Sequence, residues 1–376
     1  MNFALTEEQS QIQALAQEFA QKEILPLARS ADQHAQFPQQ VHQLALELGL
    51  LNTSLPAHLG GPGLGALELV LITEAFCHAC LGIGTALCIN ALASEPILIA
   101  GTAAQQKHYL GRLQEGAMAS FALTEPAAGS DVSGIRSRAK KVAGGYELSG
   151  SKIWISNASL ADFLVVFAKT DSEAAHHGMT AFIVPSDAPG LSIAPPISKL
   201  GQKAAPTNEV FMEQVFIPDT QRLGEEGSGF KLAMQVFDRS RPMVAAFGVG
   251  LIQRCLDESI HYARERVSMG KPILQHQAIA HKIADMRVRL EASRLLCYQS
   301  AWLLDDGQNN TLQASMAKLH AADSAMWAAT ETIQIMGGMG YSTEYAAEKL
   351  FRDAKVLQIY EGTSEIQKNI IARSIR

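Results

Sequence analysis

The sequence predicts an α+β protein in which an antiparallel β domain lies between two helical domains. Its 376 residues are enough for two or three domains. Apolar residues recur at helical spacing toward both ends, whereas short β-branched and aromatic segments bounded by turn residues occupy the middle. We expect an N-terminal helical domain at residues 1–117, a middle antiparallel β domain at 118–226 and a C-terminal four-helix bundle at 227–376.

The N-terminal domain is predicted to open with a helix that follows Thr6. Thr6 and Gln9 have the spacing of a capping box, and apolar residues then recur at helical spacing as far as Phe19. Further periodic apolar stretches cover residues 41–51, 66–79 and 96–113. The first third of the chain is therefore expected to be helical throughout.

An uncharged stretch runs from Ala75 to Ser94 and is long enough to cross a bilayer. It contains His78, Thr85 and Asn90, and such polar residues disfavour a membrane span. We expect a buried helix here and no membrane-spanning segment.

The middle domain is predicted from segments that are short, β-branched or aromatic, and bounded by Gly, Pro, Asn or Asp. They cover residues 145–148, 152–155, 163–167, 180–184 and 209–211. Segments of this length and spacing are typical of antiparallel strands joined by short loops.

Helical periodicity returns after Gly227 and continues to the C-terminus. The predicted helices cover residues 230–238, 242–267, 276–304 and 312–336, with a last helix from about Ser364. The apolar faces of these helices are wide, which predicts contacts between subunits as well as a core.

Composition excludes several classes of protein. Apolar residues make up 47% of the chain and charged residues 18%, so a disordered chain is not expected. The net charge is −6, without a basic cluster, which argues against nucleic acid as a partner. The segment from Met1 to Glu8 is acidic where a secretory signal would be basic, so we expect a cytoplasmic protein.

The five cysteines are scattered and odd in number, which predicts reduced thiols. Cys77 and Cys80 have a C-x-x-C spacing, but no second pair completes a zinc site. No metal site is predicted.

Two segments around the start of the β domain carry candidate functional residues. Residues 122–131 combine hydroxyls and glycine, and form either an ordinary turn or a site that offers hydroxyls and backbone N–H groups to a polar ring edge or phosphate. In residues 151–157, Trp154 and Ser156 share one face of a strand. They are either a core tryptophan with an incidental serine or a surface for a flavin ring.

Two further segments lie near the C-terminus. Residues 334–341 contain glycines that either cap a helix or let the backbone approach a dinucleotide, although the segment is not the G-x-G-x-x-G fingerprint. Glu361, within residues 358–367, is either a solvated acid in a first helical turn or, in an apolar cavity, a base with a raised pKa.

Together these segments resemble the acyl-CoA dehydrogenase flavoproteins, over essentially the whole chain and in the same domain order. The resemblance rests on Leu123–Pro126 with Gly129–Asp131, on Gln334–Gly340, and on Ile359–Ser364. The last of these is similar to the ending of the straight-chain short- and medium-chain members.

The resemblance implies that Glu361 is the catalytic base. It would remove the α-proton of an acyl-CoA while the β-hydrogen leaves as hydride to FAD, giving a trans-2-enoyl-CoA. The backbone N–H of Glu361 would polarise the thioester carbonyl. Some relatives carry the base at the position of Ser240, and a serine cannot act as that base.

The resemblance also implies the residues that bind FAD and substrate. The FAD-binding residues implied are Thr124, Ser130, Trp154, Ser156, Arg266, Gln277, Gln334, Gly338, Thr363 and Glu365. The substrate-binding residues implied are Ser130, Asp238, Arg241 and Tyr360. The family usually has Phe in the segment where this chain has Met269, so aromatic stacking on adenine is lost there.

By the same resemblance, electron-transferring flavoprotein accepts the electrons and the protein is a homotetramer. The adenosine half of FAD would then be bound across a subunit boundary. Alternatives are an acyl thioester oxidase, a desaturase acting on a carrier-protein thioester, and a non-catalytic flavin-binding relative. Acyl specificity depends on the volume of a pocket whose walls come from several helices.

Overall fold

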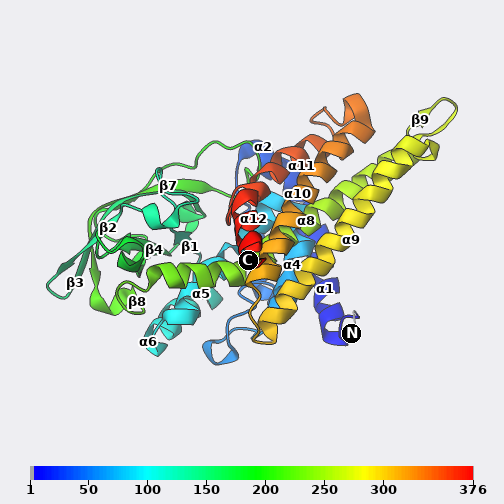
Figure 1. Cartoon of the computed structure of the whole chain (residues 1–376). Helices are drawn as coiled ribbons and strands as arrows, with labels where there is room; N and C mark the ends of the chain where they lie inside the picture. Colours follow the sequence, from blue (N-terminus) through cyan, green and yellow to red (C-terminus); the bar gives the residue numbers. More distant parts are fainter. Residues whose placement is uncertain (1–3, 376) are drawn as a thin grey trace.

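The computed structural model describes residues 4–375. Helices form both ends of the chain and a β sheet forms its middle, and in space the sheet lies to one side of the long helices (Figure 1). The predicted fold class is therefore confirmed. Residues 1–3, which belong to the acidic amino terminus, and Arg376 lie outside the described residues. The domain limits 1–117, 118–226 and 227–376 stay a prediction, because the helices of the two ends pack into one continuous core.

The N-terminal helices begin where the capping pattern predicts. Thr6 Oγ1 accepts a hydrogen bond from Gln9 N at 3.1 Å, and Thr6 N donates to Gln9 Oε1 at 3.0 Å. The helices are α1 (Glu7–Phe19), α2 (Ala28–His34), α3 (Gln39–Glu47), α4 (Ala66–Ala79), α5 (Leu81–Ala100), α6 (Ala103–Gln105) and α7 (Gly111–Gln114).

The uncharged stretch forms parts of two helices rather than one. Cys80 is extended, with φ −160° and ψ 113°, and it separates α4 from α5. By length and composition α5 could cross a membrane, but 72% of its most apolar window is buried inside the protein. The helix predicted from residue 96 is wrong in its start, because α5 continues through Pro96 to Ala100.

The β domain contains one eight-stranded sheet in the order β6–β7–β3–β2–β4–β5–β8, with β1 paired to β4. The strands are β1 (Ala119–Ala122), β2 (Arg138–Val142), β3 (Gly145–Ser156), β4 (Phe163–Lys169), β5 (Met179–Pro185), β6 (Leu191–Ile193), β7 (Thr207–Pro218) and β8 (Arg222–Leu223). Most pairings are antiparallel, as predicted, but β1 and β2 run parallel to β4. The long connection from β1 to β4, through β2 and β3, allows this direction.

The two strands predicted at 145–148 and 152–155 form the single strand β3. The register shifts between Leu148 and Gly150, and again between Lys152 and Ile155. Each shift is an irregularity of the β-bulge kind, which keeps the strand continuous while it bends.

The strand β4 is buried on both faces. On one face of β4, Leu164 and Val166 belong to a hydrophobic cluster with residues of β3 and β7. The other face, with Phe163, Val165 and Phe167, packs against helices, including the first turns of α8. This explains why its sequence is apolar without alternation.

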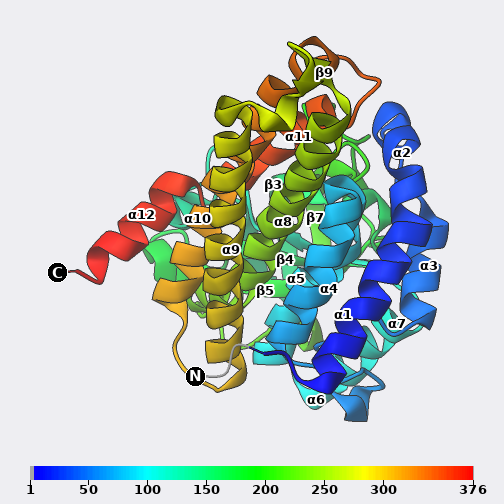
Figure 2. The same ribbon diagram turned by 90° about the vertical axis from the view of Figure 1, so that its right-hand side faces the viewer.

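The C-terminal part is a bundle of long helices with shorter ones beside it (Figure 2). Its helices are α8 (Gly229–Glu265), α9 (Gln277–Asp305), α10 (Thr311–Met336), α11 (Ala347–Ala354) and α12 (Ser364–Arg373), and a hairpin of β9 (Val267–Ser268) and β10 (Lys271–Pro272) joins α8 to α9.

The helices predicted at 230–238 and 242–267 are one helix, α8, with Pro242 inside it. Proline lacks an N–H, so the carbonyl of Asp238 loses its partner within the helix. Asn310 Nδ2 donates to this carbonyl at 3.0 Å. The helix continues because a side chain from the α9–α10 loop replaces the missing donor.

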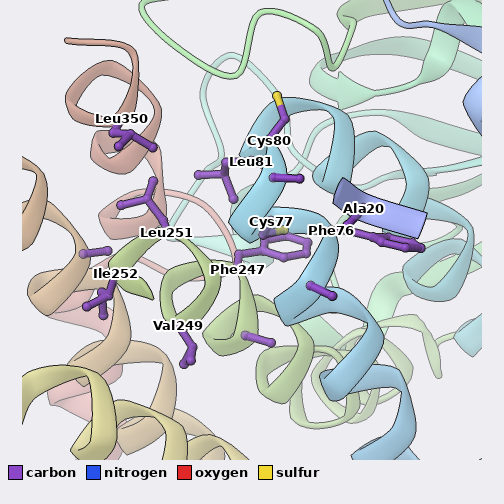
Figure 3. Packing of buried hydrophobic residues seen from close by; sticks show 14 of the residues in the cluster. Ala20, Phe76, Cys77, Cys80, Leu81, Phe247, Val249, Leu251, Ile252 and Leu350 are labelled. Carbon is purple, nitrogen blue, oxygen red and sulfur yellow. The ribbon is translucent and has the colours of Figure 1, made fainter. Parts of the chain in front are cut away.

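The core of the helical parts joins both ends of the chain. Figure 3 shows Phe76 and Cys77 of α4 beside Phe247 and Leu251 of α8, with Leu350 of α11 nearby. All five cysteines are buried and free. The N-terminal helices and the bundle thus form one framework against which the β domain is placed.

Candidate active site

Glu361 lies in a tight turn between α11 and α12. Its φ is 55° and that of Gly362 is 86°, so two consecutive residues are left-handed. For a residue with a side chain this conformation costs roughly 1–2 kcal/mol. Backbone strain of this kind is found where a side chain must be held in one direction.

The Glu361 carboxylate is half-buried and contacts α8. Ser240 Oγ donates a hydrogen bond to Glu361 Oε2 at 2.9 Å. Burial raises the pKa of Glu361, and this effect exceeds the opposing effects of Ser240, Arg241 and Lys318. A carboxylate in such a place is a stronger base than one in water. The solvated alternative for Glu361 does not fit this geometry.

Beside this contact, α8 holds a second charged pair. Arg241 Nη1 donates to Asp238 Oδ1 at 2.9 Å, and Thr311 Oγ1 donates to Asp238 Oδ2 at 2.7 Å. Arg241 is 4% exposed, and its buried Nε has no hydrogen-bond partner within the described residues. Burial lowers the pKa of Arg241. Both predicted substrate residues of α8 therefore lie one helical turn or less from Ser240.

Tyr360 connects the site to the β domain. Gln202 Nε2 donates to the Tyr360 hydroxyl at 3.3 Å, and burial raises the pKa of this hydroxyl. Gln202 belongs to the loop between β6 and β7, and Pro206 of the same loop accepts from Asn157 N at 2.8 Å. The loop thus links the end of β3 to the segment that carries Glu361.

The predicted flavin-ring segment around Thr124 is tied to β3 by a buried ion pair. Lys152 Nζ donates to Glu125 Oε1 at 2.7 Å and to Leu123 O at 3.0 Å. Burial lowers the pKa of Lys152 to about 8. Burial acts to raise the pKa of Glu125, but Lys152 and backbone N–H donors lower it overall. The Thr124 carbonyl, in turn, accepts from Ile153 N at 3.0 Å.

Trp154 and Ser156 lie at the irregular end of β3. Trp154 has φ 63° and is 55% exposed, and Ser156 is half-buried, whereas Ile155 between them is buried. Asn157 is buried, and its Oδ1 has no hydrogen-bond partner within the described residues. An exposed indole beside a hydroxyl and an unpaired amide oxygen fits a flat ring with polar edges, such as a flavin. The core-tryptophan interpretation is wrong.

A second set of predicted FAD residues lies at the other end of the bundle. Arg266, Gln277, Gln334 and Gly338 are all exposed, near the β9–β10 hairpin that projects from the long helices (Figure 1). Gln334 also lines a groove of about 550 Å³ with Tyr341 and Phe351. Within one chain, these four residues therefore do not form one site with Glu361.

The remaining predicted residues have simpler surroundings. Thr363 caps α12, because its Oγ1 accepts from Ile366 N at 3.2 Å. Glu365 is exposed in the first turn of α12, and Ser130 is exposed in the loop after Thr124. Met269 is 92% exposed at the tip of the β9–β10 hairpin.

Comparison with protein families identifies the chain along most of its length. The N-terminal, middle and C-terminal domain models of acyl-CoA dehydrogenases match residues 6–117, 120–215 and 227–376. The chain belongs to the acyl-CoA dehydrogenase family. It is therefore a flavin-dependent oxidoreductase, and its cofactor is FAD.

Individual relatives agree with this membership. A protein named probable medium-chain specific acyl-CoA dehydrogenase 2, mitochondrial, from Caenorhabditis briggsae is 39% identical over 100% of this chain and 92% of its own length. Butyryl-CoA dehydrogenase from Megasphaera elsdenii is 37% identical, with TM-score 0.97 and full coverage of both chains. PigA, solved with FAD and proline, is 31% identical, with TM-score 0.96 over 100% of this chain and 99% of its own.

Several side chains that contact the Glu361 turn of this acyl-CoA dehydrogenase are not predicted from the sequence. The sequence identifies Ser240 only as a residue that cannot be the base, yet its Oγ donates a hydrogen bond to Glu361 Oε2. Lys318 and Gln367 bond to the backbone of the Glu361 turn. A signal for Lys318 existed, because it is the one Lys, Arg, Asp or Glu within residues 314–322 of α10, where most of the other residues are small or apolar.

Proposed function

We propose that the protein dehydrogenates a short- or medium-chain acyl-CoA to the trans-2-enoyl-CoA, with Glu361 as the base. The observation that carries this proposal is the Glu361 carboxylate, strained in its backbone, half-buried, raised in pKa and bonded to Ser240. We also retain Ser130, Asp238, Arg241 and Tyr360 as the proposed contacts to acyl-CoA.

The chemistry divides between cofactor and chain. Bound FAD supplies a hydride acceptor for the hydrogen on the β-carbon. Glu361 takes the α-proton, so the two electrons of the Cα–H bond form the new double bond as the hydride leaves. Ser240 donates its hydrogen bond to Oε2 of Glu361, which leaves Oε1 to accept the α-proton. Burial excludes water, which keeps the carboxylate basic.

Residues of this chain fit FAD in two separate places. Thr124, Trp154 and Ser156 would hold the flavin ring. Arg266, Gln277, Gln334 and Gly338 would hold the adenosine and pyrophosphate half of FAD in a neighbouring subunit. Thr363 and Glu365 would complete the contacts near α12, and Ser130 those near the ring.

This separation supports a homotetramer as the proposed assembly. On α9, Val288, Leu295 and Trp302 are 68%, 52% and 53% exposed and repeat every seventh residue, so they form one apolar stripe. Such a stripe on a long bundle helix suits packing against another copy. The family resemblance further supports electron-transferring flavoprotein as acceptor, and we propose the cytoplasm as the location.

A second candidate is oxidation of a carrier-protein thioester, which includes the oxidase and desaturase alternatives. It is favoured by the similarity to the prolyl acyl carrier protein oxidase AnaB, which is 33% identical with TM-score 0.96 over 99% of this chain and 100% of its own. A non-catalytic flavin-binding relative is disfavoured, because such a protein has no need of a strained carboxylate with a raised pKa.

The deciding experiment mixes the purified FAD-loaded protein anaerobically with butyryl-, hexanoyl- and octanoyl-CoA and records flavin absorbance. We expect bleaching, with flavin reduction at equal acyl-CoA concentration fastest for one of these straight chains rather than for isobutyryl- or isovaleryl-CoA. Bleaching only by a prolyl-carrier thioester, or hydrogen peroxide release in air at the turnover rate, would favour the second candidate. A flavin that no thioester reduces would refute both.

A further inference from the structure

The turn at Glu361 and Gly362 is held by polar side chains from two other segments. Lys318 of α10 donates from Nζ to the Gly362 carbonyl at 2.6 Å. Gln367 of α12 donates from Nε2 to the carbonyls of Glu361 and Gly362 at 3.0 and 3.1 Å. Lys318 is 1% exposed and Gln367 is 0% exposed. Both carbonyls of the strained turn are therefore bound by buried donors.

These hydrogen bonds determine the direction of the backbone. The carbonyl of Glu361 belongs to the peptide plane that follows Glu361, and the carbonyl of Gly362 belongs to the next plane. Bonds to both planes restrain φ and ψ of Gly362, which lies between the two planes and is the second left-handed residue of the turn. A Cβ on Gly362 would lie 2.6 Å from Gln367 Nε2 and would displace this donor, and the φ of 86° favours glycine there.

Lys318 is an unusual residue for this place. Lysine is rarely buried unless it is paired, and within residues 4–375 Lys318 forms no ion pair. Burial lowers its pKa to about 8, while the charges of Glu361, Asp323 and Glu365 act to raise it and that of Arg241 to lower it. Its direct contact is the carbonyl of Gly362.

We propose that Lys318 and Gln367 are positioning residues, which hold the turn so that the Glu361 carboxylate and backbone N–H face the acyl thioester. This inference rests on the proposed function. The two residues differ in charge. Lys318 also acts on Glu361 electrostatically, whereas Gln367 is neutral.

This difference makes the role testable against a merely structural one. The groups that face Glu361 are Ser240 and Arg241 from α8 and Lys318 from α10, and on its own segment it neighbours Tyr360. Loss of Gln367 changes none of these charges. Loss of Lys318 removes one of the groups that lower the pKa of Glu361.

The test measures anaerobic flavin reduction by butyryl-CoA in a stopped-flow instrument across a pH series, with the FAD-loaded protein. We expect Gln367→Leu to lower the pH-independent (plateau) rate of flavin reduction about 100-fold, as for a base misplaced by about 1 Å. The acid limb of the pH–rate profile, where the rate falls as Glu361 is protonated, should stay at the same pH. Lys318→Met should lower the plateau similarly and move the acid limb to higher pH. FAD absorbance and acyl-CoA affinity should stay close to the parent in both.

The matched control is Lys282→Met, which removes a lysine that pairs with Glu331 between α9 and α10. It should leave the plateau and the acid limb unchanged. Parent-like plateau rates in both site variants, or a lowered Tm without a change in rate, would overturn the inference. If Lys318→Met does not fold, the plateau rate of Gln367→Leu decides.

Glu361→Gln, measured in parallel, separates this inference from the proposed function. If Glu361→Gln still reduces the flavin at the parent rate, the proposed base is wrong. If Glu361→Gln is inactive while both positioning variants react at the parent rate, only the positioning role is refuted.

Discussion

The surroundings of Glu361 and the β9–β10 hairpin end of the bundle are built differently. Around Glu361 the polar groups are buried and multiply bonded, as in the contacts of Ser240, Lys318 and Gln367. At the other end of the bundle, Arg266 and Gln334 are exposed. The polar groups at the Glu361 end are bonded to one another within this chain, whereas those at the hairpin end are exposed on it.

This difference follows from the chemistry that each place would perform. A base needs a fixed direction and little water, and both require burial. A phosphate or an adenosine needs charge and hydrogen bonds, which exposed side chains can provide when a second subunit encloses them. Substitutions at the Glu361 end should therefore affect rate, and those at the hairpin end should affect cofactor affinity.

The largest effect is expected at Glu361. Glu361→Gln keeps the shape of the side chain but removes the proton acceptor, so flavin reduction by acyl-CoA should fall by about 1000-fold or more. Bound FAD, measured by absorbance after gel filtration, should not change. If Glu361→Gln lost FAD together with activity, the Glu361 end would affect cofactor affinity as well as rate, and the expected division between the two ends would be wrong.

The next effect is expected at the hairpin end. Arg266→Ala should weaken FAD binding by about 10- to 100-fold, because a charged hydrogen bond to phosphate is lost. Titration of apoprotein with FAD measures this change, and the exposed neighbour Arg264 provides the control Arg264→Ala. An unchanged Kd for FAD would remove Arg266 from the site.

A smaller effect, on rate, is expected at Ser240. Ser240→Ala removes a donor that lowers the pKa of Glu361, so this pKa should rise further. Because Glu361 must be ionised to accept a proton, activity is lost as pH falls through its pKa. The acid limb of kcat/KM should therefore move to higher pH, with about a tenfold loss near the limb. Ser259→Ala, on the same helix, should leave the limb in place.

The smallest effect is expected at Met269. Met269→Phe restores an aromatic ring at the hairpin tip and should tighten FAD binding about 3- to 10-fold through stacking on adenine. Met269→Leu provides an apolar side chain without a ring and should bind FAD as the parent does. Equal affinities for the two variants would place adenine away from the hairpin tip.

Sequence patterns predicted the fold where local signals are strong. The capping box at Thr6 placed the start of α1, and apolar segments bounded by turn residues placed β4 and β5, whereas β1, β2, β6 and β8 lie outside the predicted segments. Errors occurred where a tertiary contact overrides a local signal. Pro242 does not end its helix, because Asn310 from a distant segment satisfies the carbonyl that proline frees.

Sequence patterns alone left the site undecided. Glu361 could be a solvated acid or a base, and only its burial against α8 distinguishes the two. Ser240 lies 121 residues and Lys318 lies 44 residues from its partner in the turn, and no local sequence pattern links positions so far apart. Gln367 lies 6 and 5 residues from the two carbonyls that it binds. Such contacts depend on how helices pack, which hydrophobic periodicity does not specify.

The length of α8 has a consequence for how the protein unfolds. Its early residues Leu232 and Val236 pack against β4 and β5, and its later residues lie in the core of the helical parts. A single rod embedded in both cores couples their melting, so calorimetry should record one cooperative transition. The β domain cut out alone would expose Phe163 and Phe167 and would aggregate through that face.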